Sequence, residues 1–140
     1  MDNACILETR LLDLNSATEI LAAAKISGRL LELVPLTGGA NNRVFQLNFE
    51  NIPSLILKSY FQHPQDLRLR LKTEFEFLSF AWEQGIRCIP EPLYKDSTQN
   101  FAIYSYVDGS LARAKHSTLS FVEAAAGFLL KLFIHYAHNQ

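Results

Sequence analysis

Lys58 is the most informative residue for chemistry in this sequence, because it interrupts a stretch that is otherwise apolar. It follows Leu57 directly and stands two positions before the aromatic pair Tyr60 and Phe61. Burying an ammonium group costs free energy unless an anion meets it. We therefore expect Lys58 to meet an anion. The alternative is that its stem lies on apolar surface while its head stays in water.

A helical segment downstream contains a candidate carboxylate. Residues 65–84 contain neither Gly nor Pro, and at about 100° per residue their apolar side chains form one stripe. Glu74 lies at the edge of this stripe, whereas Glu76 lies on the opposite side. Glu74 is therefore the carboxylate expected to meet Lys58, unless it pairs at the surface with a basic neighbour such as Lys72.

A glycine-bearing loop, TGGANN, lies upstream of Lys58. Gly38 and Gly39 would leave backbone N–H groups exposed, and such groups bind phosphate. The same residues, with Asn41 and Asn42, would equally suit a plain hairpin turn. Together with Lys58, the loop makes nucleotide binding the working hypothesis.

The composition indicates one folded domain and excludes several classes of partner. The chain has 140 residues, 49% of them hydrophobic and 19% charged, which is typical of a globular protein. A formal charge of -1 gives no general basic footprint for nucleic acid or for an anionic membrane surface. Any anion site must therefore be local.

The cysteines, the termini and the histidines indicate a cytoplasmic protein without a metal site. Cys5 and Cys88 form no disulfide framework, and the N-terminus has no signal-peptide pattern. Glu123 and Lys131 interrupt the most apolar tract, which argues against a membrane span. His135 and His138 lie on one helix face, but no third ligand is apparent, so no metal site is expected.

The pattern of apolar residues and turn residues predicts an α+β fold. We expect a five-stranded antiparallel sheet with one inserted helix and flanking N- and C-terminal helices. Ser16 and Glu19 match a capping box, and Gly28 would end the first helix. The expected helices are 16–27, 65–84 and 121–138, and the expected strands are 30–36, 43–49, 55–61, 93–95 and 101–107.

The final helix differs from the others because its apolar residues surround it completely. A helix that is apolar on all sides is expected to be buried on all sides. The chain therefore divides into an N-terminal helical segment, 1–29, a central domain, 30–109, and the start of a second, truncated lobe, 110–140. Alternatively, the exposed helix could join two copies of the chain into a homodimer.

Four stretches in order resemble the N-terminal lobe of the aminoglycoside phosphotransferase and choline kinase family, which has a protein-kinase-like fold. They are LTGGANNRVFQL, LILKSY, RLKTEFEFLSFAWEQGIRCIPEPL and IYSYVDG. The resemblance covers residues 30–109 and, more loosely, the final helix. It implies an ATP-dependent kinase that transfers the γ-phosphoryl group to a hydroxyl of a small-molecule substrate, with Mg²⁺.

The resemblance also implies roles for individual residues. Lys58 would hold the α- and β-phosphates of ATP, and Glu74 would orient this lysine. Ile56 would pack on the base, and Tyr104 would border the back of the pocket. Ser105 and Val107 would form the hinge that meets the adenine edge. The loop over the phosphates would consist of Gly38, Gly39, Ala40, Asn41 and Asn42.

The sequence departs from the family in one important respect. The family uses a catalytic aspartate in an HxDxxxxN-like loop and a later metal-binding aspartate, and no aspartate here follows a histidine by two positions. We therefore expect no catalytic residue in this chain and place the Mg²⁺ ligands in a missing lobe. The alternative is a catalytically inactive half-kinase that binds a partner or itself. A different enzyme is disfavoured, because no Ser/His/Asp or Cys/His arrangement is present.

Overall fold

The computed structural model describes residues 12–37, 42–62, 64–110 and 118–138. Over these residues the chain forms, in order, α1 (Leu14–Ala23), β1 (Leu30–Leu36), β2 (Arg43–Phe49), β3 (Leu55–Ser59), α2 (Arg70–Glu83), β4 (Pro92–Asp96), β5 (Phe101–Ser105) and α3 (Leu119–His138). The strands make one antiparallel sheet in the order β1-β2-β3-β5-β4. The predicted α+β architecture is confirmed.

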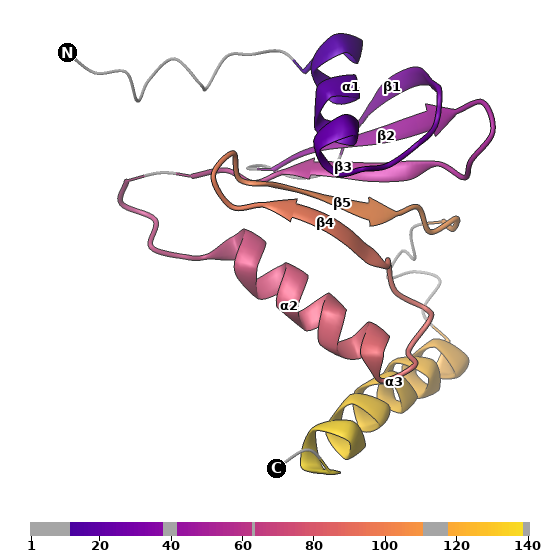
Figure 1. The fold of residues 1–140 in the computed structure, drawn as a ribbon. Helices are drawn as coiled ribbons and strands as arrows, with labels where there is room; N and C mark the ends of the chain where they lie inside the picture. The colour runs from indigo at the N-terminus through magenta and orange to yellow at the C-terminus, as the bar shows by residue number, and fades with distance from the viewer. Residues whose placement is uncertain (1–11, 38–41, 63, 111–117, 139–140) are drawn as a thin grey trace.

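The sheet separates two packed layers, as Figure 1 shows, with α1 on one side and α2 on the other. Strand β5 pairs with both β3 and β4, and Leu57 of β3 lies opposite Ile103 while Lys58 lies opposite Ala102. Because side chains alternate along a strand, Leu57 and Ile103 point to one face and Lys58 to the other.

Each face of the sheet has its own apolar core. The core beneath α1 consists of Ala17, Leu21, Leu47, Phe49, Leu55, Leu57, Phe101 and Ile103. The core beside α2 consists of Tyr60, Leu71, Leu78, Ala81, Ile86, Ile89, Ala102 and Tyr104. Lys58 therefore projects from a strand whose opposite face is buried.

Helix α1 begins and ends earlier than the sequence predicts. The side chain of Asp13 accepts a hydrogen bond from the N–H of Ser16 at 2.7 Å, so Asp13 is the N-cap. The predicted capping box of Ser16 and Glu19 is therefore wrong. Gly28 does not end the helix either, because α1 already stops before Lys25, which takes the left-handed conformation at φ 56°.

Gly28 instead allows close packing between the chain after α1 and the β2–β3 turn. A Cβ at this position would lie 2.7 Å from Ile52 Cδ1 and 2.9 Å from Phe49 Cδ1. We expect Gly28→Ala to lower the free energy of unfolding by about 1–3 kcal/mol, because overpacking forces side chains to shift. Urea unfolding measures this loss. Gly127→Ala in α3 is the control, since its Cβ meets nothing within 4 Å and should not destabilise the chain. Equal effects of the two changes would contradict the packing role.

Helix α2 begins five residues later than predicted, because Asp66 holds the preceding residues as a loop. Asp66 accepts hydrogen bonds from Arg68 Nε at 2.7 Å and from Arg70 Nη2 at 2.6 Å. The hydrogen bond from Arg68 is the main reason that the pKa of Asp66 lies well below its usual range. The loop thus leads directly into the first turn of α2.

Three strands also differ in length from the prediction. Beyond β3, the N–H of Tyr60 donates to the carbonyl of Asn100 in the β4–β5 turn at 2.9 Å. Beyond β5, the N–H of Tyr106 donates to the carbonyl of Ser54 at 3.3 Å. Both strands end two residues before the predicted positions, and β4 is one residue longer at each end than 93–95.

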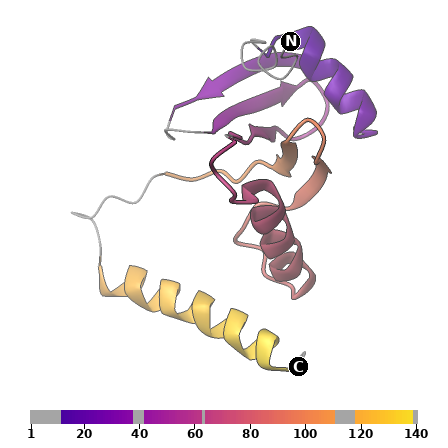
Figure 2. The same cartoon turned by 90° about the vertical axis from the view of Figure 1, so that its left-hand side faces the viewer.

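Helix α3 contacts the rest of the chain along one narrow face. Phe128 and Leu132 pack against the core beside α2, but no residue of α3 is buried. Its other large apolar side chains are 44–73% exposed, and Figure 2 shows the helix standing apart from the sheet. The remaining faces of α3 are therefore exposed, because no other described element covers them.

Helix α3 is also long and apolar enough to cross a membrane, as judged by length and composition alone. Within its 20 residues, an 18-residue window reaches a mean hydropathy of 1.4, and none of that window is buried. Glu123 and Lys131 do not exclude a span by these criteria. The composition of this helix therefore does not support the expectation, made from the sequence, that the chain lacks a membrane span.

Candidate functional site

Lys58 and Glu74 form an ion pair that joins β3 to α2. Lys58 Nζ donates to both carboxylate oxygens of Glu74, each at 2.7 Å. Lys58 lies in β3, while Glu74 lies one turn into α2. The pairing expected from strand alternation and helix spacing is therefore present.

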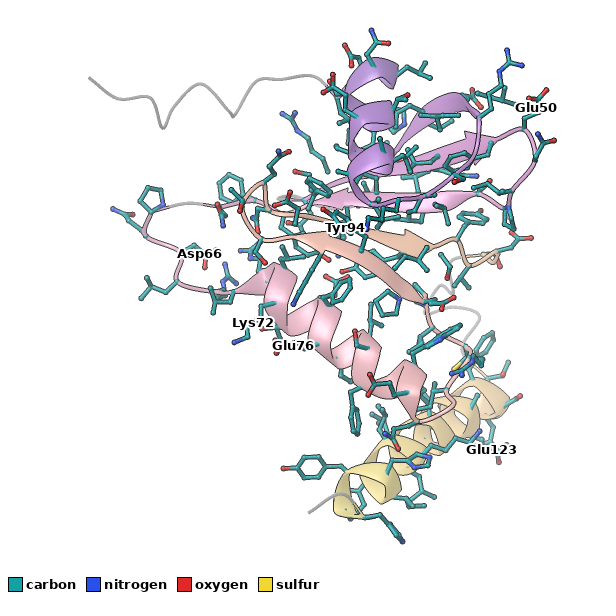
Figure 3. The ribbon with its side chains drawn as sticks, viewed as in Figure 1. Glu50, Asp66, Lys72, Glu76, Tyr94 and Glu123 are labelled. Atoms are coloured by element: carbon teal, nitrogen blue, oxygen red, sulfur yellow. The ribbon has the colours of Figure 1, made fainter. Side chains whose placement is uncertain are left out.

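Neither Arg70 nor Lys72, the basic residues of α2, pairs with Glu74, and Glu76 does not pair with Lys58. Lys72 and Glu76 are exposed, and Figure 3 shows both on the side of α2 away from the sheet. Arg70 pairs with Asp66 instead. Glu74 thus pairs with Lys58, and the alternative of a surface ion pair between Glu74 and Lys72 is wrong.

The surroundings of Lys58 also argue against a lysine that simply extends into water. Its side chain is 20% exposed and that of Glu74 is 37% exposed. The ammonium lies 4.9 Å from the centroid of the Tyr60 ring, a distance at which a cation is attracted to the ring face. A carboxylate and an aromatic ring thus fix a positive charge on one face of the central strand, β3.

Two buried phenols lie next to this ion pair. The hydroxyls of Tyr60 and Tyr104 are 2.6 Å apart, and the two residues are buried. Burial is the main reason that the pKa of Tyr60 lies far above its ordinary value, with further contributions from Tyr104 and Glu74. Burial also raises the pKa of Tyr104 to about 12. Both phenols therefore stay protonated at neutral pH.

The raised phenol pKa values predict a loss of stability at high pH. An unfolded tyrosine ionises near pH ~10, so these two residues contribute stability below that pH and lose it as the pH rises toward the folded value of about 12 for Tyr104. We expect phenolate absorbance and circular dichroism to change together in this range. The double variant Tyr60→Phe/Tyr104→Phe should lose less stability over the same range. An equal loss in both proteins would contradict the assignment.

Ile56 and Tyr104 lie opposite each other in the register of β3 and β5. Ile56 shares the face of β3 that carries Lys58, and it packs at the margin of the core beside α2. The ring of Phe75 lies 6.0 Å from that of Tyr104. The structure therefore brings Ile56, Tyr104 and the lysine to one face of the sheet.

The predicted hinge begins at Ser105, the last residue of β5. The N–H of Ser105 donates to the carbonyl of Glu91 at 2.9 Å, and the Oγ of Ser105 accepts the N–H of Glu91 at 2.8 Å. These bonds fix the end of β5. Val107 is 49% exposed, and its N–H makes no hydrogen bond within the described part of the chain.

The predicted phosphate loop lies mostly outside the described residues, since these omit 38–41 and therefore Gly38, Gly39, Ala40 and Asn41. Asn42 is described, and its Oδ1 accepts the N–H of Phe61 at 3.1 Å. This bond ties the start of β2 to the end of β3.

Two open cavities in the described part of the chain are lined by residues of α2 and α3, and Lys58 lines neither of them. One of about 440 Å³ follows the first turns of α2 past Thr73, Glu74 and Phe77. The other, of about 700 Å³, lies between Arg87 and the residues of α3 near Lys131. Ile56 and Val107 line neither of them.

An antiparallel five-stranded sheet, with a strand lysine held by a carboxylate of the inserted helix, is the arrangement of a kinase-like N-terminal lobe. A model of the phosphotransferase enzyme family matches residues 32–133. The chain belongs to this family. No curated protein matches the chain. The family match extends through residue 133 and so includes most of α3.

Proposed function

We propose that this chain is the ATP-binding lobe of a small-molecule phosphotransferase. The observation that carries the proposal is the pair of 2.7 Å hydrogen bonds from Lys58 to Glu74, in a chain of the phosphotransferase family. A lysine oriented in this way is suited to hold the α- and β-phosphates of ATP. The carboxylate keeps the ammonium in place before the nucleotide arrives.

The adenine would lie against Ile56, on the same face as the lysine. Tyr104 would close the back of the site, and the carbonyl of Ser105 and the N–H of Val107 would meet the edge of the base. The exposed Val107, whose N–H makes no hydrogen bond within the described residues, supports this role. The backbone of residues 38–42 would cover the phosphates.

The phosphoryl group would come from ATP, and Mg²⁺ would neutralise charge that develops during transfer. The described residues contain no cluster of three or more His, Cys, Asp or Glu side chains able to hold a metal ion. Because no aspartate in the sequence follows a histidine by two positions, as in the catalytic loop of the family, we assign the catalytic aspartate and the Mg²⁺ ligands to a separate catalytic lobe. On this proposal the chain alone is inactive, works in the cytoplasm, and serves an acceptor that is a small-molecule hydroxyl.

Saturation-transfer NMR with ATP tests the proposal, because it detects binding in the millimolar range. We expect magnetisation transfer to the adenine protons, and we expect ADP to compete for it. The result that would contradict the proposal is no transfer at millimolar ATP from a chain whose circular dichroism shows it to be folded.

A second candidate function is that of an inactive half-kinase that associates through α3. The observation in its favour is the 44–73% exposure of the large apolar side chains on this helix. Exposed apolar patches commonly mark interaction surfaces. Sedimentation equilibrium would show a mass that rises with concentration if copies associate in this way, and a constant monomer mass if they do not.

A further inference from the structure

Tyr60 occupies the position where β3, β5 and α2 meet. Its main chain is held from both sides by Asn100: the N–H of Tyr60 donates to the Asn100 carbonyl at 2.9 Å, and Asn100 Nδ2 donates to the Tyr60 carbonyl at 2.7 Å. Asn100 itself takes the left-handed conformation, with φ 59°, which asparagine tolerates better than most residues. The backbone at Tyr60 is therefore fixed independently of its side chain.

The side chain of Tyr60 is fixed at its far end as well. Its hydroxyl lies 2.6 Å from that of Tyr104, and the two residues are 4% and 3% exposed. Tyr104 is the last residue before the predicted hinge residue Ser105. A bonded pair of phenols thus connects the end of β3 to the strand that enters the hinge.

The ammonium of Lys58 lies over the face of the Tyr60 ring, 4.9 Å from the ring centroid. Glu74 holds the same ammonium through both carboxylate oxygens. The lysine therefore has two supports, one charged and one aromatic. The carboxylate is the more exposed of the two, since Glu74 is 37% exposed while Tyr60 is 4% exposed.

We propose that Tyr60 is a positioning residue for Lys58, and that Tyr104 holds the Tyr60 ring in the orientation this requires. Any buried tyrosine needs a hydrogen-bond partner for its hydroxyl, but this ring also presents its face to the ammonium of Lys58. The inference that the position of Lys58 sets the affinity for phosphates rests on the proposed nucleotide function. The positioning of Lys58 by Tyr60 does not depend on that function.

Lysine acetylation followed by mass spectrometry tests the positioning directly, without a nucleotide. The labelling rate of Lys58 reports how often its amine leaves the carboxylate. In Tyr60→Leu, we expect this rate to rise about fivefold, as loss of a cation–π contact would produce. In Tyr60→Phe/Tyr104→Phe, which removes both hydroxyls and leaves neither unpaired, we expect a rise of about twofold because the ring loses its anchor.

Two other lysines provide internal controls. Lys95 lies in β4 with its ammonium 5.1 Å from the centroid of the Phe75 ring, and Lys72 is exposed on α2. Their rates should stay unchanged in both variants. A rise of all three rates together would show general loosening and overturn the proposal. An unchanged Lys58 rate in folded Tyr60→Leu would also overturn it, and if that variant does not fold, the double variant decides in the same way.

Nucleotide binding then separates this inference from the proposed function. We expect Tyr60→Leu to bind ATP about fivefold more weakly while its affinity for adenosine is unchanged, because only ATP has phosphates for Lys58 to hold. Equal weakening of both ligands would reduce Tyr60 to a packing role. Failure of the wild-type chain to bind ATP, with the labelling result intact, would overturn the proposed function and leave the positioning of Lys58 standing.

Discussion

Replacing Lys58 by methionine is expected to weaken ATP binding by about 10- to 100-fold, because hydrogen bonds to charged groups contribute about 1.5–3 kcal/mol. Methionine keeps an unbranched apolar stem in β3 and removes the charge that would meet the phosphates. The fold should survive, since Glu74 is 37% exposed and water can solvate its carboxylate once the lysine is gone. Titration calorimetry, or ligand-observed NMR if affinity is low, measures the change.

Lys95→Met is the matched control for this experiment. Lys95 of β4 and Lys58 of β3 both lie opposite Ala102 of β5. The ammonium of Lys95 also lies near an aromatic ring, that of Phe75. It has no carboxylate partner within the described residues. We expect Lys95→Met to leave ATP affinity within about twofold of the wild-type value, since it removes no charged hydrogen bond. Equal losses of ATP affinity in the two variants would contradict a specific role of Lys58 in holding the phosphates.

Replacing Ile103 by alanine is expected to lower the free energy of unfolding by about 2–5 kcal/mol, because it leaves a cavity in a closely packed interior. Ile103 is fully buried in β5, which pairs with both β3 and β4. Its side chain belongs to the core beneath α1, opposite Leu57. Urea unfolding followed by circular dichroism measures the loss.

Ile103→Val provides the control for the cavity. It removes one methylene group and should cost only about 0.5–1.5 kcal/mol. If alanine and valine cost the same, or if alanine costs less than about 1 kcal/mol, the side chain does not fill the core as described. The comparison is also a control for the nucleotide-binding experiments. It shows how far the free energy of unfolding can fall while the sheet stays folded.

The sequence predicted the sheet and the lysine–carboxylate pair because both depend on short-range periodicity. The alternation of β3 placed Lys58 on the face opposite Leu57, and the phase of the apolar stripe in α2 selected Glu74 over Glu76. The structure shows this alternation and this pairing. The five strands also followed from turn residues between β-prone segments.

The partners of Lys58 beyond Glu74 could not be predicted in the same way. The alternation of the strand places Tyr60 on the same face as Lys58, but it does not show that the Tyr60 hydroxyl meets that of Tyr104, 44 positions later. Such a contact depends on the register of β3 and β5, which periodicity alone does not fix. The clearest signal available was that both tyrosines fall on the lysine side of their strands.

The ends of the helices were predicted least well, because competing polar side chains decided them. Asp13 caps α1 in place of Ser16, and Asp66 with Arg68 and Arg70 replaces the first five predicted residues of α2 by a loop. Helix α3 shows a third kind of difference. Its apolar residues indicated a helix that needs neighbours on all sides, and the described residues provide contacts only at Phe128 and Leu132.

Mapping amide shifts in a two-dimensional NMR titration with ATP tests the central claim most directly. We expect the shifts to concentrate at Ile56, Lys58 and Val107, on β3 and just after β5, and we expect Lys58→Met to reduce them at equal ATP concentration. Shifts confined to the cavity between Arg87 and α3, or no shifts from a folded chain at millimolar ATP, would contradict the assignment of this face of the sheet as the nucleotide site.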